Sequence, residues 1–323
     1  MRVSSSTVWV VAAAMTILAT VTASAQPYPS KPIRVVSPAG GGGGDVVARL
    51  LANGLAERVA QQVVIDNRPS GIIMGQIVAK AAPDGYTLLF AGSTHWLSPF
   101  MVTRTNSGFD PVKDFSPIAL ATSSPNIVVV TSSLGVKSIK DLIALAKAKP
   151  GELNYGRAGA GGSSHISAEL FKAMAAVNIV SVPYKGSGPA LIGLLSGQVQ
   201  VIFATAPTVA PHVKSGKLNA LAVTTAQPSA LFPGLATVAA SGVPGYESAT
   251  IYGFLAPVRT SAAVIRKLNQ EIGAMLAGPE MKEKLLNAGV EPAGGTPPEF
   301  AGKIRAEMTL LGKLIKDAAI SAE

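Results

Sequence analysis

The sequence contains no cysteine, and this absence excludes several kinds of chemistry. Without cysteine there is no disulfide framework, no thiolate metal site and no cysteine for lipid attachment. Histidine is also scarce: only His95, His165 and His212 occur, and they are too far apart in sequence to form a helical metal-binding motif. No metal-ligating residue is therefore assigned.

Charged residues are sparse as well, at 14% of the chain, although lysine and arginine outnumber aspartate and glutamate by 27 to 18. The lysines are scattered, and they form no dense basic block with interleaved aromatic residues. A nucleic-acid surface requires such clustering, so we expect no nucleic-acid partner. The net charge of +9 predicts a mild attraction for small acidic molecules.

Signatures of common enzyme sites are missing. The run Gly40–Gly44 lacks the lysine and hydroxyl residue of a P-loop and the third glycine of a dinucleotide fingerprint. No Gly-x-Ser-x-Gly nucleophile elbow occurs. Ser164 and His165 make a poor catalytic dyad, because adjacent residues on a helix do not face each other. We therefore expect no cofactor and no enzymatic activity, and we assign no catalytic residue.

Residues 1–25 have the features of a secretory signal peptide. Arg2 supplies the positive start, residues 8–21 the apolar stretch, and residues 23–25 a small-residue cleavage pattern. An uncleaved membrane anchor is the alternative, but the apolar stretch is shorter than the roughly 20 residues that a spanning helix needs. We predict export across one membrane with cleavage after Ala25.

Hydrophobic periodicity predicts alternating strands and helices in the rest of the chain. Asp45 is expected to cap a helix whose apolar positions run from Val47 to Val59, and a β-branched strand returns at 62–66. Further strands are expected at 33–37, 87–91, 153–158, 179–182, 199–203 and 218–223, and further helices from 138, from 163, over 261–277 and from 296. This alternation is typical of parallel sheets covered by helices on both faces.

The mature chain is longer than one hydrophobic core usually holds, which favours two domains. Two apolar extended runs, Asn126–Val130 and Ile251–Leu255, separate blocks that each form a complete α/β unit. If the chain crosses between domains at these runs, a cleft lies between the domains. The alternative is that both runs are ordinary core strands of one large domain.

Two of the expected strands run into glycine clusters that continue into amphipathic helices. These clusters are Gly40–Gly44 and Gly159–Gly162. A helix N-terminus offers unpaired N–H donors and the positive end of the macrodipole, and glycine lets a ligand approach the backbone closely. Each run alone is equally compatible with a flexible turn. Because one run falls in each half of the chain, the pair predicts one shared anion site.

Several motifs occur along the chain in a characteristic order. They are Tyr28–Ile33, Gly40–Arg49, Asp66–Pro69, Ala82–Thr87, Asp110–Phe115, Ser163–His165, Val182–Gly186 and Gly216–Val223. With these motifs the mature chain closely resembles the periplasmic solute-binding proteins of tripartite tricarboxylate transporters, often called Bug receptors. The resemblance implies an α/β, two-lobed periplasmic-binding-protein fold (a Venus flytrap), in which each lobe is a sheet flanked by helices. With two crossover segments, lobe 1 would comprise 26–126 and 253–323, and lobe 2 127–252.

The resemblance also implies a function. A periplasmic receptor of this kind, expected here to be a monomer, closes on a small carboxylate and delivers it to the permease subunits of a membrane transporter. The family holds the carboxylate mainly with backbone N–H groups, hydroxyls and ordered water. Removing a carboxylate from water is costly, so three or four charge-assisted hydrogen bonds of about 1.5 to 3 kcal/mol each are needed. The alternatives are a receptor that signals to a membrane sensor and, less favoured, an enzyme acting on a small carboxylate.

Ligand contacts are expected on both lobes. The predicted ligand-binding residues are Ala39, Gly40 and Gly41 of the first glycine run, Ser93 and Thr94 after the strand 87–91, and Arg157, Gly159, Ser163, Ser164 and His165 of lobe 2. His165 is expected either to donate to the ligand or to stabilise its own loop. Asp45 is excluded, because an inward carboxylate would repel an acidic substrate.

Three departures from the family pattern modify the expected site. Residues 70–75 are interpreted as a short apolar loop, which favours an aromatic or branched carboxylate. Arg157 stands where a small residue is common; we hypothesise that it pairs with a second carboxylate or caps the cleft rim, and an outward solvated side chain is the alternative. Ala204 stands where aspartate is common, which weakens any preference for an amine-bearing substrate.

Overall fold

The computed structural model of the chain describes residues 28–38, 40, 43–68, 71–100, 108–157, 162–184 and 186–317. Its strands are β1 (Ile33–Ser37), β2 (Val63–Asn67), β3 (Thr87–Gly92), β4 (Phe115–Thr131), β5 (Asn154–Arg157), β6 (Val180–Pro183), β7 (Val201–Thr205), β8 (Leu218–Val223), β9 (Ala249–Pro257) and β10 (Glu291–Pro292). Its α-helices are α2 (Gly43–Val59), α3 (Gly71–Ala79), α4 (Ser93–Leu97), α5 (Ile139–Ala148), α6 (Ser163–Ala175), α7 (Ser187–Leu195), α8 (Ala206–Lys214), α9 (Ala262–Ala277), α10 (Pro279–Asn287) and α11 (Pro297–Asp317).

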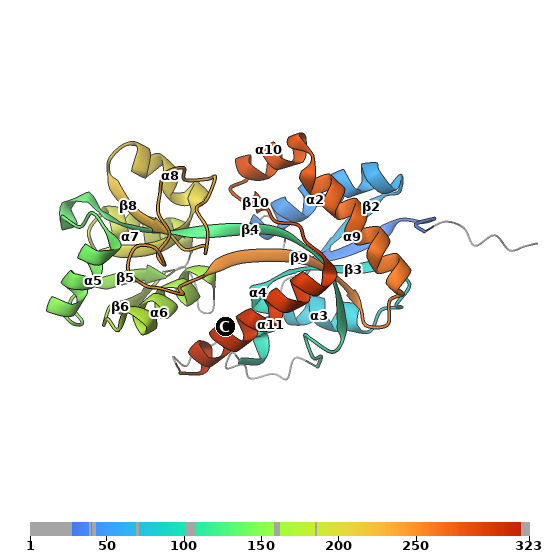
Figure 1. The fold of residues 1–323 in the computed structure, drawn as a ribbon, viewed down its shortest axis with the longest axis horizontal. Helices are drawn as coiled ribbons and strands as arrows, with labels where there is room; N and C mark the ends of the chain where they lie inside the picture. Colours follow the sequence, from blue (N-terminus) through green and yellow to red (C-terminus); the bar gives the residue numbers. More distant parts are fainter. Residues whose placement is uncertain are drawn as a thin grey trace, which may run out of the picture. The chain divides into compact units, whose positions relative to one another are not determined.

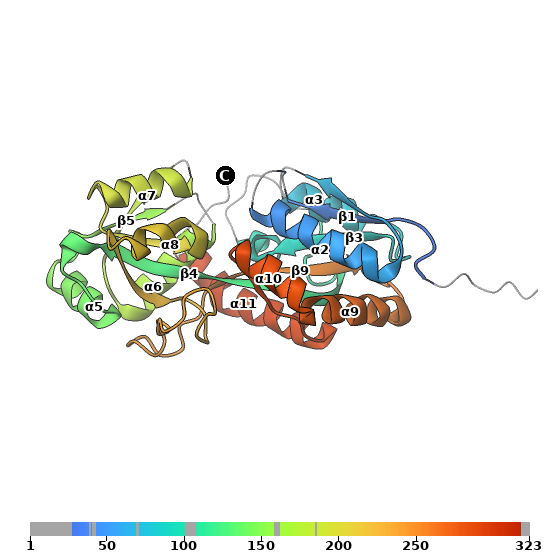
Figure 2. The same cartoon turned by 90° about the horizontal axis from the view of Figure 1, so that it is seen from above.

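The long strand β4 takes part in both halves of the sheet system. Its residues 115–125 pair with β9, from which the sheet continues through β3 and β1 to β2. Its residues 126–131 pair instead with β7 and β8, and β7 continues to β5 and β6. Figure 1 and Figure 2 both show β4 and β9 extending through the middle of the fold, with helices on either side. The pairing partner of β4 therefore changes at Asn126, where the first crossover was predicted.

The strand directions confirm the prediction of parallel sheets only in part. β1 pairs in parallel with β2 and β3, and β5 pairs in parallel with β6 and β7. β4 and β9 run antiparallel to each other, and each is also antiparallel to its other principal neighbour, β7 or β3. Parallel pairs need a crossover connection such as a helix. Because β4 leaves the first half and β9 returns to it, these two strands must run in opposite directions.

Helices cover the strands as the α/β alternation predicts. In the first half α2 packs on β1, β2 and α9, and α3 packs on β1 and β3. In the second half both α6 and α7 pack on β5 and β7, and α8 packs on β4 and β8. The apolar stripe predicted for α2 is confirmed, since Val47, Leu51 and Leu55 are at most 2% exposed. The two-lobed α/β fold inferred from the sequence is thus the observed one.

Helix α11 contacts both halves of the fold. It packs on β4 and α4 and also on α6, and Figure 1 shows it running along the β4 and β9 strands. Its predicted capping box is confirmed: the Thr296 N–H donates to Glu299 Oε2 at 2.7 Å, and the Glu299 N–H donates to Thr296 Oγ1 at 3.4 Å. The second predicted capping residue is confirmed too, because Ser138 Oγ accepts from the Asp141 N–H at 3.1 Å.

Two local expectations are wrong. Residues 71–75 belong to helix α3, not to a loop, because their apolar side chains have a buried surface to cover: Met74 and Val78 are 5% and 0% exposed. Asp45 does not cap its helix from outside, since α2 already begins at Gly43. The Asp45 carboxylate instead accepts a hydrogen bond from Asn67 Nδ2 at 2.8 Å and pairs with Arg49 Nε at 2.9 Å.

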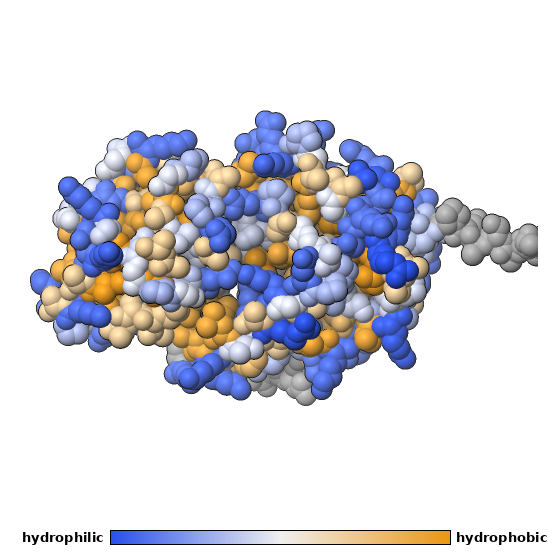
Figure 3. Space-filling view, viewed as in Figure 1, coloured by the Kyte–Doolittle hydropathy of each residue, from blue (hydrophilic) through white to orange (hydrophobic). Residues whose placement is uncertain are grey.

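The predicted leader, with its cleavage position after Ala25, lies outside the described residues. Over the part of the chain that is described, no helix combines the length and the hydropathy needed to cross a bilayer. Figure 3 shows hydrophilic and hydrophobic side chains mixed over one face, with hydrophilic ones concentrated around α9 and β2. Several basic side chains pair with acids one helical turn away, such as Lys267 with Glu271 at 2.8 Å and Lys284 with Glu280 at 2.6 Å.

A chain of buried hydrogen bonds ties β4 and the start of β9 to α6. Asn126 Nδ2 donates to Ser167 Oγ at 2.9 Å, and the hydroxyls of Ser167 and Ser248 lie 2.7 Å apart. The Tyr246 hydroxyl donates to the Ser167 carbonyl oxygen at 2.8 Å, and the Asn126 N–H donates to Thr224 Oγ1 at 2.8 Å. All five residues are at most 5% exposed. Buried polar groups depend on one another in such a network, so it fixes the two crossover strands against α6.

Removing the central hydroxyl is expected to destabilise the protein. In Ser167→Ala, the Asn126 amide and the Ser248 hydroxyl lose a partner without gaining water, which costs about 1 to 3 kcal/mol of unfolding free energy. Urea denaturation followed by circular dichroism measures this difference. Ser133→Ala is the matched control, because the Ser133 hydroxyl is exposed and makes only a 3.3 Å bond to Thr131. Equal stability of the two variants would contradict the role given to the network.

Candidate functional site

Two neighbouring cavities lie at the N-terminus of α6, and Gly162 and Ser163 line both of them. Cavity 1 has a volume of about 160 Å³ and is lined by residues of β4, β5, α6, α7 and β7. Cavity 2 has a volume of about 200 Å³ and is lined by residues of β3, α4, α6, β9 and α11, together with Ser248. None of the described residues that line either cavity is Asp, Glu, Lys or Arg.

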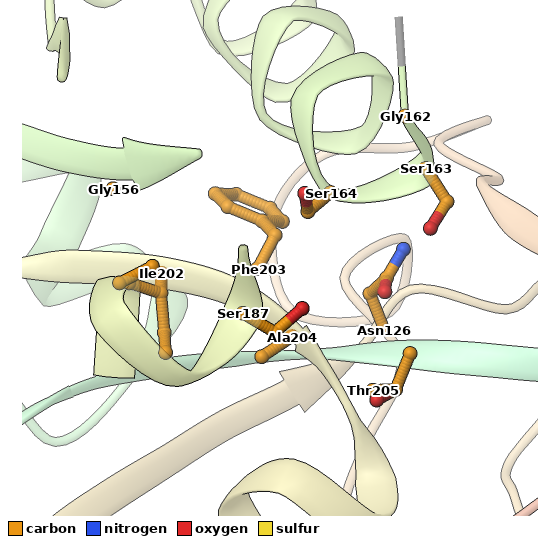
Figure 4. A pocket seen from close by; sticks show the side chains of 11 residues that line it. Asn126, Gly156, Gly162, Ser163, Ser164, Ser187, Ile202, Phe203, Ala204 and Thr205 are labelled. Carbon is orange, nitrogen blue, oxygen red and sulfur yellow. The ribbon is translucent and has the colours of Figure 1, made fainter. Parts of the chain in front are cut away.

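Cavity 1 is largely polar on the side that faces α6. Figure 4 shows the side chains of Ser163 and Ser164 on the first turn of α6, opposite Asn126 of β4, with Ser187 and Thr205 on the remaining walls. The apolar lining residues are Ile202, Phe203 and Ala204 of β7 and Ala190 of α7. Hydroxyls can donate to an acidic ligand as well as accept from it, so this cavity suits a small polar group.

Cavity 2 brings predicted residues from both halves of the sequence together. Ser93 and Thr94 begin helix α4, directly after β3, and Ser163 begins α6. Both halves of the chain thus contribute to the lining of cavity 2, the first half through Ser93 and Thr94. The outcome for the first glycine run is different, because Gly40 is exposed beside Asn67 and Asp45 and lines neither cavity.

The N-terminus of α6 supplies donors without a competing cap. Its N-cap is Gly162, with extended φ and ψ of −71° and 164°, and glycine has no side chain to satisfy the N–H groups of the first turn. This 13-residue helix also places the positive end of its macrodipole beside both cavities. Such an end favours an anion by about 0.3 to 1 kcal/mol at exposed sites, so hydrogen bonds must supply most of the binding free energy.

Arg157 and His165 line neither cavity. Arg157 ends β5 and lies on the same face of that strand as Tyr155, because side chains two residues apart share a face. Tyr155 faces α6, where its hydroxyl donates to Glu169 at 2.6 Å. Burial lowers the pKa of His165, and the positive charge of Arg157 lowers it further. His165 is therefore neutral at pH 7, and its side chain is 8% exposed.

The remaining predicted residues have different outcomes. Ser164 lines cavity 1 together with Ser163. Ala39, Gly41 and Gly159 lie outside the described residues.

Tyr252, which was not predicted from the sequence, lines cavity 2 from β9. Its ring stacks on Phe90, with centroids 5.4 Å apart and planes inclined by 11°. A Cβ added at Gly44 would lie 3.1 Å from the Tyr252 hydroxyl oxygen, and one added at Gly92 would lie 2.8 Å from the Ile251 carbonyl oxygen. The sequence feature that could have indicated this residue is its position, as a tyrosine within the apolar run Ile251–Leu255. Asn126, an amide at the start of the first run, was a similar signal.

A buried tryptophan lies next to Ser93 and Thr94. Trp96 is 0% exposed, and its Nε1–H donates to Glu307 Oε2 of α11 at 2.8 Å. Desolvation raises the pKa of Glu307; Trp96, Ser93 and Lys303 oppose this shift, and Glu247 adds to it. The bond from Trp96 to Glu307 thus joins α4, which carries Ser93 and Thr94, to α11.

Comparison with known proteins identifies the family. The model of the tripartite tricarboxylate transporter family receptor, TctC, matches residues 47–320. Protein BugT of Bordetella pertussis is 33% identical over 297 residues, which is 91% of this chain and 91% of BugT. The chain belongs to the TctC receptor family.

Solved structures of two relatives share the fold of this TctC receptor. One is R. palustris Rpa4515 with adipate, 38% identical, with a TM-score of 0.74 over 92% of this chain and 100% of that chain. Another is MatC (Rpa3494) from Rhodopseudomonas palustris with bound malate, 26% identical, with a TM-score of 0.70 over 89% of this chain and 100% of that chain. The family resemblance and the two-lobed fold inferred from the sequence are both confirmed.

The buried carboxyl of Glu307 predicts a specific pH dependence. Its pKa is raised in the folded protein, so protonation stabilises the fold; this contribution is complete below the ordinary glutamate pKa and is lost as pH rises through the folded value. Glu307→Gln keeps an acceptor for Trp96 but carries no titrating proton. We expect the stability of the wild type, relative to this variant, to fall across that window.

Urea unfolding of both proteins at a series of pH values measures the difference. Glu283→Gln, at an exposed position of α10, is the control. Parallel stability profiles for wild type and Glu307→Gln would rule out a raised Glu307 pKa.

Proposed function

We propose that this TctC receptor is a periplasmic solute-binding protein that captures a small carboxylate and delivers it to the membrane subunits of a tripartite transporter. The observation that carries the proposal is cavity 2, where Ser93 and Thr94 from one half of the chain meet Ser163 at the N-terminus of α6. The adipate and malate found with the two R. palustris relatives support a carboxylate as the ligand class.

The chemistry of the cavities fits an acid held by neutral donors. A carboxylate accepts hydrogen bonds only, and each bond to such a charged group contributes about 1.5 to 3 kcal/mol. The hydroxyls of Ser163 and Ser164, together with the first-turn N–H groups of α6, offer enough donors to replace much of the lost hydration. We propose that residues 39–41 and Gly159 add backbone donors, as their positions in the glycine runs suggest.

Closure of two lobes is the proposed means of capture. The proposed lobes are residues 26–126 with 253–323, and residues 127–252. The change of pairing partner along β4 at Asn126 supports the first boundary. A receptor of this kind acts as a monomer in the periplasm after its leader is removed behind Ala25. None of the described residues that line the two cavities is Asp, Glu, Lys, Arg or His, so these side chains include no carboxylate, amine or imidazole to act as general acid or base on the ligand.

Ligand screening tests the proposal directly. A ligand that binds only the folded protein raises its stability by about 2.7 kcal/mol when present at a hundred times its Kd. We expect thermal shifts with small carboxylates and none with the corresponding amides, followed by calorimetry on each hit. Ser163→Ala should weaken binding by roughly tenfold, whereas Ser133→Ala should leave it unchanged.

Recovery of the ligand distinguishes a receptor from an enzyme. After prolonged incubation, a receptor returns the acid chemically unchanged and in stoichiometric amount. Turnover would favour the enzyme alternative. Ligand-dependent binding to a membrane sensor, without uptake through a transporter, would favour the sensory one.

The role hypothesised for Arg157 stays a prediction. If its guanidinium pairs with a second carboxylate, Arg157→Ala should weaken binding of a dicarboxylate by about tenfold or more, because a charge-assisted bond is lost. Binding of a monocarboxylate should not change. Arg266→Ala is the control, since Arg266 is exposed on α9. Calorimetry with both acids measures the effect, and an unchanged dicarboxylate affinity would assign Arg157 to the solvated surface.

A further inference from the structure

The walls of cavity 2 are unexpectedly apolar for a receptor in a family named after tricarboxylates. Leu97 of α4, Ile166 of α6 and Leu311 of α11 converge on it, and they are 0%, 4% and 5% exposed. Ala249 extends this wall from β9. A polar substituent placed against these side chains would lose its hydration and find no partner. The wall therefore suits a hydrocarbon.

The size of the cavity sets the size of that hydrocarbon. Cavity 2 has a volume of about 200 Å³. A cavity of about 150 Å³ lined by leucine, isoleucine and phenylalanine is enough to hold benzene. A body of about six carbons therefore fits cavity 2, and a ligand that extends past Ser163 reaches the hydroxyls of cavity 1.

Hydroxyls line the rest of cavity 2, those of Ser93, Thr94, Ser163, Ser248, Thr250 and Tyr252. The Tyr252 hydroxyl makes no hydrogen bond with any residue that the structure describes. Its ring is fixed by stacking on Phe90 and by the close approach of Gly44 and Gly92. Burial raises the pKa of Tyr252, so the hydroxyl keeps its proton at neutral pH and is available as a donor. A tyrosine held rigidly in this way loses little entropy when it binds an anion.

We infer that Tyr252 donates a hydrogen bond to the ligand carboxylate, and that the wall of Leu97, Ile166 and Leu311 selects acids with an unsubstituted hydrocarbon body over hydroxylated polycarboxylates. The inference rests on the proposed function, because it assumes that an acid occupies these cavities. Adipate and hexanoate belong to the favoured class. Malate and citrate belong to the disfavoured class, because each would bring a hydroxyl against the wall and citrate a third carboxylate as well.

Calorimetry with five acids tests the selectivity. Hexanoate and adipate should each bind the wild-type protein at least tenfold more tightly than malate and citrate. Succinate compared with malate isolates the effect of a single hydroxyl, and succinate should bind more tightly. If malate or citrate binds as tightly as adipate, the inference is overturned while the proposed function stands. If no acid of the panel binds, the proposed function itself fails.

The role of Tyr252 has its own test. Tyr252→Phe keeps the ring and its stacking on Phe90 but removes the hydroxyl, so the protein should retain its melting temperature. Affinity for adipate should fall about tenfold or more, since a hydrogen bond to a charged group is lost. Tyr86→Phe, at a position that lines neither cavity, should leave the affinity unchanged. Unchanged adipate binding by folded Tyr252→Phe would remove Tyr252 from the site.

Discussion

The withdrawal of an anion from water is the constraint on which the proposed site depends. A buried ion is tolerated only when fixed donors replace its hydration. None of the described residues that line the two cavities carries a positive charge. In the proposed site, hydroxyls and the N–H groups at the start of α6 therefore replace the hydration of the anion. Each hydrogen bond from such a donor contributes only a small part of the free energy that the anion loses on leaving water. The donors must therefore be numerous and rigidly placed, and rigid placement is what the surrounding fold provides.

The two crossover strands, β4 and β9, are held rigidly against the helix α6. β4 exchanges its pairing partner at Asn126, and the same residue bonds to Ser167 of α6, which bonds in turn to Ser248 just before β9. One hydrogen-bonded chain thus links both crossovers to the helix whose first turn faces the cavities. A shift of either crossover would carry the donors of α6 with it. The same hydrogen bonds therefore hold both the crossover strands and the helix α6 in place.

Sequence reasoning succeeded where the signal was local or periodic. The apolar stripe of α2 and the Thr296–Glu299 capping box both follow from spacing. It was wrong for residues 71–75, because a short apolar run does not by itself distinguish a loop from a buried helix. It missed Tyr252, because the place of a side chain in a cavity depends on contacts between distant segments, here Phe90, Gly44 and Gly92.

Glycine illustrates the same difference between pattern and contact. The first glycine run was interpreted as open backbone for a ligand, and Gly40 is indeed exposed. Gly44, however, is buried against Pro38 and the Tyr252 hydroxyl, where any side chain would crowd the ring. The missing Cβ at this position thus makes room for a tyrosine of the protein. Two glycines of one cluster thus differ in their surroundings, and this difference follows from the contacts of each glycine and not from the sequence pattern.

In the proposed site, carboxylate binding and ligand selection depend on different residues of the cavities. In the proposed site, donors from the backbone and from serine hydroxyls bind the carboxylate but do not discriminate between the rest of one ligand and another. That discrimination must come from the walls, and in cavity 2 these are contributed by α4, α6 and α11, which are distant in sequence. A substitution at Leu97 of α4 or Leu311 of α11 changes one wall of cavity 2 without altering a residue of α6. The proposed site therefore allows ligand selectivity to change independently of carboxylate binding, provided that the hydrogen bonds through Ser167 stay intact.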